Sequence, residues 1–309
     1  MRRTIHGSAR VRRLPASIAI GVIALVLTVP GAAGADHPLG NVPWSTLLPP
    51  REVAGPAVPA QPCGAQPTSA CVDGVIADMV ENFEPLDTAC DPRAVFALTY
   101  LLTTEAFRET LDTGFFADQD AIIQLDRVFA DLFFAATDAY ETGDAPPAWT
   151  IAFDAATAGR TNAVQDLFLG MNAHIQRDLP VALAAVGLVA PDGSSRKPDH
   201  DAVNEILAGV LDYIEGEVGR LYDPLVTFAD ASPSPVDEMG ALEMLKLWRE
   251  GAWRNAERLT LARTDAERAS VMKQIETYAT VWAQLIAAAD FGWYSARRSA
   301  YCSAAHQAA

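Results

Sequence analysis

The sequence predicts an all-α fold, a single multi-helix bundle-like domain of about eight helices. From Cys71 onward apolar residues recur with helical spacing, whereas no run of alternating apolar and polar residues is bounded by hairpin turns. No repeat of fixed length is recognisable, which favours a closed bundle over a solenoid. At 309 residues and 50% hydrophobic composition, the chain is long enough to bury one sizeable core.

The amino-terminal residues have the composition of a signal peptide. An apolar stretch at residues 16–29 is followed by a small-residue cleavage site ending at Ala35, and five arginines precede it: Arg2, Arg3, Arg10, Arg12 and Arg13. We therefore predict a signal peptide at residues 1–35 and a secreted or extracytoplasmic protein. The apolar stretch is short for a membrane span, and an uncleaved anchor is the alternative.

The negative charge of the chain argues against some classes of binding partner. Cleavage near Ala35 would remove five arginines and no acids, which changes the net charge from −16 to −21. Because nucleic acid and anionic membrane surfaces are also negatively charged, they should repel this protein, and we do not expect them as partners. We therefore expect the protein to bind a small molecule or no partner.

Residues 36–62 contain seven prolines, which indicates an extended tether or a strap over the surface, and the helical domain is predicted at residues 63–309. All four cysteines lie beyond the cleavage site, and an even number in an exported chain predicts two disulfides. Of the three pairings we favour Cys63–Cys71 and Cys90–Cys302. The Cys-x-x-Cys spacing typical of zinc sites is absent.

Periodicity and capping residues give the order of the helices. Asp91, Asp118 and Asp201 are expected N-caps, and Pro180 is expected to interrupt one helix. The expected helices are at about residues 71–83, 91–107, 119–140, from 147, 162–179, 181–188, 202–222, 238–261 and 266–289.

A few polar residues violate the amphipathic pattern of these helices. On helical wheels, four charged residues fall inside apolar stripes: Asp126, Asp178, Glu217 and Arg249. His174 and Asn172 lie at the two edges of one stripe. Because a buried unpaired charge costs several kcal/mol, we expect these residues to meet one another.

Three interpretations of this polar centre remain open. In the first, it is a purely structural salt-bridged network. In the second, His174 and Asp178, four residues apart, bind one divalent metal ion with Asp126 or His200 as third ligand. In the third, His174 is a metal-free general base that Asp178 or Asp126 orients, and Arg249 holds an anionic group of the substrate. The enzymatic interpretations predict a hydrolase, and the alternative is a non-catalytic binding or structural domain.

Two further residues are weaker binding candidates. His200 stands between two acids at an expected helix start, where such residues more often form caps and turns. Trp253, like the other tryptophans, fits a core position better than a ligand cage. Phosphate-binding loops, nucleophile elbows and dinucleotide fingerprints are absent from the sequence.

The stretch from Leu169 to Pro180, LGMNAHIQRDLP, resembles the signature of a mostly actinobacterial family, domain-of-unknown-function family 5995. Other matching segments are residues 96–100, 125–130, 147–149, 199–204 and 248–253. The resemblance implies a helical domain and, in exported members, paired cysteines. It implies no activity, so no catalytic role is transferred, but its motif residues here include Asp126, Asn172, His174, Asp178 and Arg249.

Overall fold

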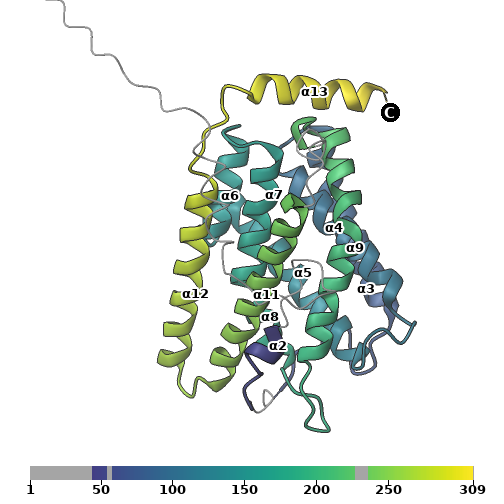
Figure 1. The fold of residues 1–309 in the computed structure, drawn as a ribbon, viewed down its shortest axis with the longest axis vertical. Coiled ribbons are helices and arrows are strands. Elements are labelled where there is room, and N and C mark those ends of the chain that lie inside the picture. The colour runs from purple at the N-terminus through teal and green to yellow at the C-terminus, as the bar shows by residue number, and fades with distance from the viewer. Residues whose placement is uncertain (1–43, 54–57, 227–235, 309) are drawn as a thin grey trace, which may run out of the picture. The chain divides into compact units, whose positions relative to one another are not determined.

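The structure, a computed structural model, describes residues 44–53, 58–226 and 236–308. The predicted signal peptide lies outside these residues. Residues 39–309 form one compact unit, and its described part is helical without a strand, which confirms the predicted fold class (Figure 1). In chain order the elements are α2 (Trp44–Leu47), α3 (Ser69–Thr88), α4 (Ala94–Thr110), α5 (Gln119–Thr142), α6 (Pro147–Thr157), α7 (Ala163–Met171), η1 (Asn172–Asp178), α8 (Leu179–Val186), α9 (Lys197–Leu221), α11 (Val236–Leu261), α12 (Asp265–Ile286) and α13 (Ser295–Ala308).

The continuous segment α7–η1–α8 occupies the centre of this unit. Its residues are almost all buried, and α4, α5, α6, α11 and α12 pack against it. A helix that is apolar on all sides must be covered on all sides, and α8 has the sequence LPVALAAV. The central position of this segment follows from that composition.

Side-chain caps explain several helix starts. Asp118 accepts a hydrogen bond from Ala121 N at 3.1 Å at the start of α5, as predicted. The predicted cap Asp201 is wrong, because α9 begins earlier, at Lys197, with Pro198 in its first turn. Proline is favoured there, and Asp201 instead pairs with Lys197 Nζ one turn away, at 2.5 Å.

Helix α13 was not expected from the sequence. It has no continuous apolar stripe, and it lies across one end of the bundle (Figure 1). Arg298 attaches it to Asp166 of α7 at 2.5 Å, and Asp223 is 3.9 Å from the same guanidinium. Ion pairs and a disulfide, rather than an apolar face, therefore hold this helix.

Both disulfides form with the predicted pairing, Cys63–Cys71 and Cys90–Cys302. The second joins residues 212 positions apart, and closing so long a loop removes about 5 kcal/mol of unfolded-state entropy in the loop-closure model. Two disulfides suggest an extracytoplasmic protein.

The described part of the proline-rich segment lies against the bundle as a strap. The Arg254 guanidinium of α11 donates to the carbonyls of Leu48 and Pro49, and Arg51 N donates to Glu257 at 2.8 Å. Further along, Ala60 N donates to Ala185 O at 2.8 Å.

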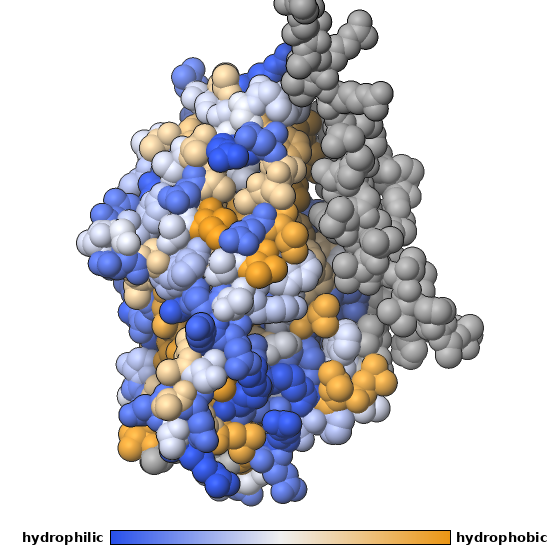
Figure 2. All heavy atoms as spheres, turned by 90° about the vertical axis from the view of Figure 1, so that its left-hand side faces the viewer, coloured by the Kyte–Doolittle hydropathy of each residue, from blue (hydrophilic) through white to orange (hydrophobic). Residues whose placement is uncertain are grey.

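The outer face of α12 carries exposed apolar side chains. Tyr278, Val281 and Leu285 share one stripe and are 51%, 47% and 58% exposed. Figure 2 views that side of the molecule and shows hydrophobic side chains among hydrophilic ones. In the part of the chain that the structure describes, no helix combines the length and apolar character that membrane crossing needs.

Gly170 provides a test of the packing around α7. A Cβ at this position would lie 2.2 Å from Cγ of the buried Phe96 ring, so Gly170→Ala should destabilise the fold by about 1–3 kcal/mol, measured by urea unfolding with the disulfides intact. The matched control is Gly216→Ala in α9, where nothing lies within 4 Å of the added Cβ. Because alanine favours helix, that variant should be up to about 1 kcal/mol more stable. Equal effects of both substitutions would contradict the packing described.

Candidate functional site

The interrupted helix forms a π-helical turn. In η1 the backbone hydrogen bonds join residues five positions apart, as in Leu179 N donating to His174 O. Pro180 follows directly, and it has no N–H to donate and crowds the preceding turn of an α-helix. The helix interruption predicted at Pro180 is therefore present as this π-helical turn. Such turns occur frequently at functional sites.

The Asp178 carboxylate is the centre of the site. It is fully buried and accepts three hydrogen bonds. Trp149 Nε1 of α6 and His174 Nδ1 donate to Oδ2 at 2.9 and 3.1 Å, and Arg177 donates to Oδ1 at 2.6 Å. Arg177 in turn contacts Glu276 of α12 at 3.2 Å. Three donors, one of them cationic, favour an ionised carboxylate here.

His174 is enclosed by aromatic rings. Its imidazole stacks on Phe129 of α5 with centroids 3.5 Å apart, and the Tyr100 ring of α4 lies at 4.6 Å. Burial lowers the pKa of His174, although the nearby Asp178 acts in the opposite direction, so the imidazole is neutral at pH 7. Because a carboxylate can only accept, the proton is on Nδ1 and Nε2 holds a lone pair. Among the described residues, that Nε2 is buried with no hydrogen-bond partner.

Two more buried polar atoms are unsatisfied, one on Tyr100, which contacts His174, and one on Asp126, whose charge acts on Tyr100. Within the described ranges, the Tyr100 hydroxyl and Asp126 Oδ2 also have no hydrogen-bond partner. Burial raises the pKa of Asp126 to about 7, because it outweighs the charge of Arg127. Burial and the negative charges of Asp126 and Asp178 raise the pKa of Tyr100, which therefore remains a protonated donor.

The predicted residues do not form one network. Arg249 does not pair with Asp126 or Asp178: its guanidinium donates to Asn204 Oδ1 at 2.8 Å and to His200 O at 2.5 Å, between α11 and α9. Burial lowers its pKa to about 10. The expectation that these charges meet is therefore wrong for Arg249. It is also wrong for Glu217, which pairs with Arg220 of its own helix at 2.5 Å. Asp178 is neutralised by Arg177, its neighbour in sequence.

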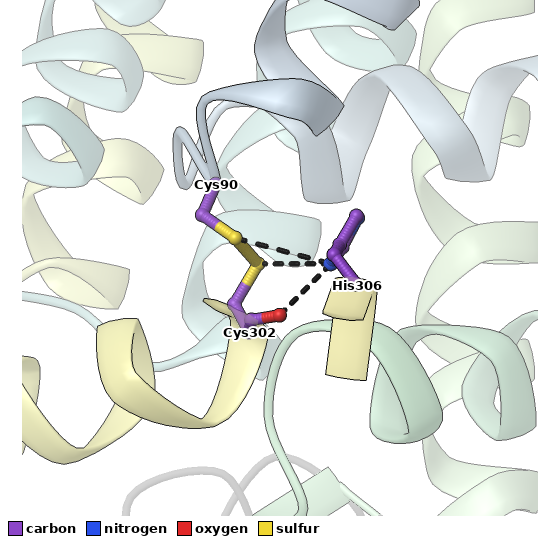
Figure 3. Close-up of side chains that lie close together, drawn as sticks. All are labelled: Cys90, Cys302 and His306. Atoms are coloured by element: carbon purple, nitrogen blue, oxygen red, sulfur yellow. Dashed lines mark hydrogen bonds between the residues drawn. A yellow bond between two sulfur atoms is a disulfide. The ribbon is translucent and has the colours of Figure 1, made fainter. Parts of the chain in front are cut away.

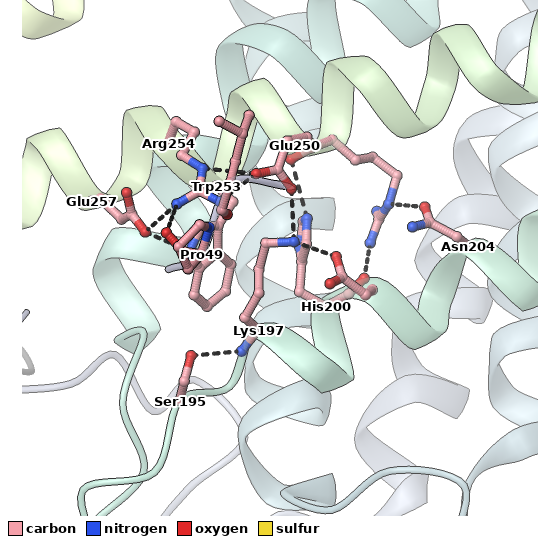
Figure 4. A network of polar contacts seen from close by, with 12 residues as sticks. Pro49, Ser195, Lys197, His200, Asn204, Glu250, Trp253, Arg254 and Glu257 are labelled. Carbon is pink, nitrogen blue, oxygen red and sulfur yellow. Dashed lines mark hydrogen bonds and ion pairs between the residues drawn. The ribbon is translucent and has the colours of Figure 1, made fainter. Parts of the chain in front are cut away.

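The side chains around Arg249 belong to a second polar cluster, between α9, α11 and the strap (Figure 4). Lys197, 1% exposed, pairs with Asp201 and with Glu250 at 2.7 Å. Glu250 also pairs with Arg254, which contacts Glu257 at 3.0 Å. Opposite charges alternate through this cluster, so it is a buried salt-bridge network.

The other predicted binding residues, His200, Trp253 and Asn172, lie outside the contacts of the Asp178 carboxylate. His200 and Trp253 border a cavity of about 20 Å³, which has room for about one water molecule. His200 Nε2 donates to Arg249 O at 3.1 Å. Asn172 donates to Ala279 O of α12 at 2.9 Å and accepts from Gln176, so it joins η1 to α12.

The geometry does not favour the predicted metal site. His174 and Asp178 are hydrogen-bonded to each other, which directs Nδ1 and Oδ2 toward one another rather than toward a shared ion. In the described part of the chain, the potential ligand atoms that cluster within 4.8 Å come from Cys90, Cys302 and His306, and these cysteines form a disulfide.

The sequence reasoning missed four residues of the site: Tyr100, Phe129, Trp149 and Arg177. The first three are aromatic residues on apolar stripes, where a wheel gives no reason to suspect a role. All four do lie in the segments that carry the family resemblance, which was the available signal.

The isolated carboxyl of Asp126 gives a pH-dependent prediction. Its pKa is about 7 in the folded chain, against an ordinary value of 3.8. Because the folded state favours the protonated carboxyl, the free energy of unfolding falls as the pH rises from about 4 to 7. Asp126→Asn should therefore be more stable than the wild type at pH 8, by roughly 1–4 kcal/mol, and equal to it near pH 4.

The control is Asp131→Asn on the same helix, a 46% exposed residue paired with Arg127. Its effect should be below about 1 kcal/mol at pH 8. Thermal unfolding at the two pH values measures both. If Asp126→Asn is less stable than the wild type at pH 8, Asp126 has a partner that this geometry does not show.

Comparison with known proteins gives one match. No curated protein and no solved structure matches the chain significantly. A family model described as a family of unknown function, DUF5995, matches residues 72–289, which include α4 to α12 and the whole His174 site. The resemblance seen in the sequence is thereby confirmed, and the chain belongs to the DUF5995 family.

Proposed function

We propose that this protein is an extracytoplasmic, metal-independent hydrolase whose acid–base centre is His174. One observation carries the proposal: His174 has its Nδ1 proton fixed by Asp178, while its Nε2 lone pair is buried and unsatisfied. A carboxylate that orients an imidazole in this way is the arrangement of a general base.

Each neighbouring group has a role that its chemistry suits. Asp178 holds the tautomer and stabilises the imidazolium that forms when Nε2 takes a proton from water. The Tyr100 hydroxyl is an available donor to an oxygen that gains negative charge. Asp126, with a pKa of about 7, is partly protonated near neutral pH and is suited to give a proton to the leaving group.

Access to His174 requires a side chain to move. The imidazole is 2% exposed, and half-buried Phe129 stacks directly on it. In this proposal Phe129 is the cover of the site, and a small substrate enters when its ring rotates away.

A second candidate function is a non-catalytic domain whose polar residues fix the register of the helices. It is favoured by the complete pairing of the Asp178 carboxylate and by the enclosure of His174. Under this alternative, the unsatisfied atoms at His174 are only a cost to stability.

Hydrolysis of p-nitrophenyl acetate distinguishes the two. With His174 as base and Asp126 as acid, the rate should follow a bell-shaped pH profile, rising through a pKa below 6.5 and falling through about 7. His174→Gln should lower the rate at least about 100-fold and abolish the rising limb. His37→Gln controls for hydrolysis of the ester by any histidine of the chain, and it should change neither the rate nor the rising limb of the pH profile. Equal rates in both variants would favour the non-catalytic domain.

The predicted signal peptide is part of this proposal. Its composition and the two disulfides support export. Amino-terminal sequencing of the protein recovered from outside the cytoplasm should begin at Asp36, and a retained Met1 would contradict cleavage.

A further inference from the structure

A histidine lies against the disulfide that joins α13 to the end of α3. Figure 3 shows the His306 ring beside both sulfurs. Its Nδ1 is 3.5 Å from Cys302 Sγ and 3.9 Å from Cys90 Sγ, and it donates to Cys302 O at 2.9 Å. On the other side of the ring, Nε2 is 2.8 Å from Asp87 Oδ1. Both ring nitrogens thus face acceptors.

The surroundings favour the charged form of this histidine. The hydrogen bond to Asp87 is the main reason that the pKa of His306 is raised. Tyr222 also donates to Asp87, and Arg220 is the nearby charge that opposes protonation. An imidazolium beside a sulfur stabilises a thiolate, because the opposite charges attract.

The two sulfurs differ in exposure. Cys302 is 2% exposed, whereas Cys90 is half-buried, and the disulfide borders a cavity of about 20 Å³. Cys90 also has a φ of 50°, a left-handed backbone conformation that costs a residue other than glycine about 1–2 kcal/mol. Exposed and strained disulfides are the ones that undergo exchange most readily.

We propose that Cys90–Cys302 is a thiol–disulfide exchange site that accepts two electrons from a dithiol. A thiolate of the dithiol attacks Cys90 Sγ, the Sγ–Sγ bond breaks, and its electron pair leaves on Cys302 Sγ, beside His306. The second thiol then attacks its partner sulfur in the mixed disulfide and releases Cys90, which takes a proton. The dithiol becomes a disulfide, and Cys90 and Cys302 become reduced.

The second disulfide of the chain is an internal control. The neighbour of the Cys63 sulfur is a carbonyl oxygen, Ile123 O at 3.8 Å, which would repel rather than stabilise a thiolate. The inference therefore predicts different rates for two disulfides in one molecule.

The test treats the full exported chain with glutathione at pH 7, alkylates free thiols with iodoacetamide after short times, and locates the products by peptide mass spectrometry. Glutathione should be found on Cys90 and the alkyl group on Cys302, at least about tenfold more often than the reverse. Opening of Cys90–Cys302 should be at least about tenfold faster than that of Cys63–Cys71. His306→Gln should remove most of this difference without changing the Cys63–Cys71 rate.

Either of two results would overturn the inference: glutathione on Cys302 as often as on Cys90, or a His306→Gln variant that opens as fast as the wild type. The first comparison needs only the wild-type protein, so it decides the matter even if the variant fails to fold.

Discussion

The ionised carboxylate of Asp178, fully buried in the core, is the constraint on which the surrounding structure depends. An isolated carboxylate there would cost many kcal/mol, and only its three donors make the position tolerable. Those donors come from α6 and η1, and Arg177 extends the network to Glu276 on α12. Any shift of these elements relative to one another would leave a buried charge partly unsatisfied. The polar centre thus determines the register of the helices in addition to any chemistry it performs.

Much of the fold was predictable from the sequence, because apolar periodicity and caps such as Asp118 act locally. The carboxyl-terminal helix was not, since α13 is held by Arg298 and a disulfide to distant residues rather than by an apolar stripe. Pro198 likewise moved the start of α9 before Asp201, where two local signals competed and the proline prevailed.

The site was predictable in part. Helical wheels identified Asp126, Asp178 and Arg249 as out of place, but a wheel cannot say which buried charges meet. It also assumes a constant rotation per residue, which fails across η1. Arg177, the neighbour of Asp178 in sequence, neutralises that carboxylate, whereas Arg249 binds neutral oxygens at His200 and Asn204. The contact between His306 and the disulfide was likewise hidden, because it depends on a helix that the pattern did not show.

The two buried polar clusters differ in a way that bears on function. In the cluster of Lys197, Glu250 and Arg254, each charge faces an opposite charge. Among the described residues, the one unsatisfied ring atom there is Nδ1 of His200, whose imidazole is held by the carbonyl of Arg249 rather than by a carboxylate. In the His174 site the Asp178 carboxylate is equally well paired, but His174, Tyr100 and Asp126 each have a buried atom without a hydrogen-bond partner in the described part of the chain. Each such atom costs about 1–3 kcal/mol, and phenylalanine in place of Tyr100 would avoid part of that cost. In the proposed hydrolase these groups stand next to an oriented imidazole, so their cost in stability is offset by acid–base capacity, a relation found at active sites.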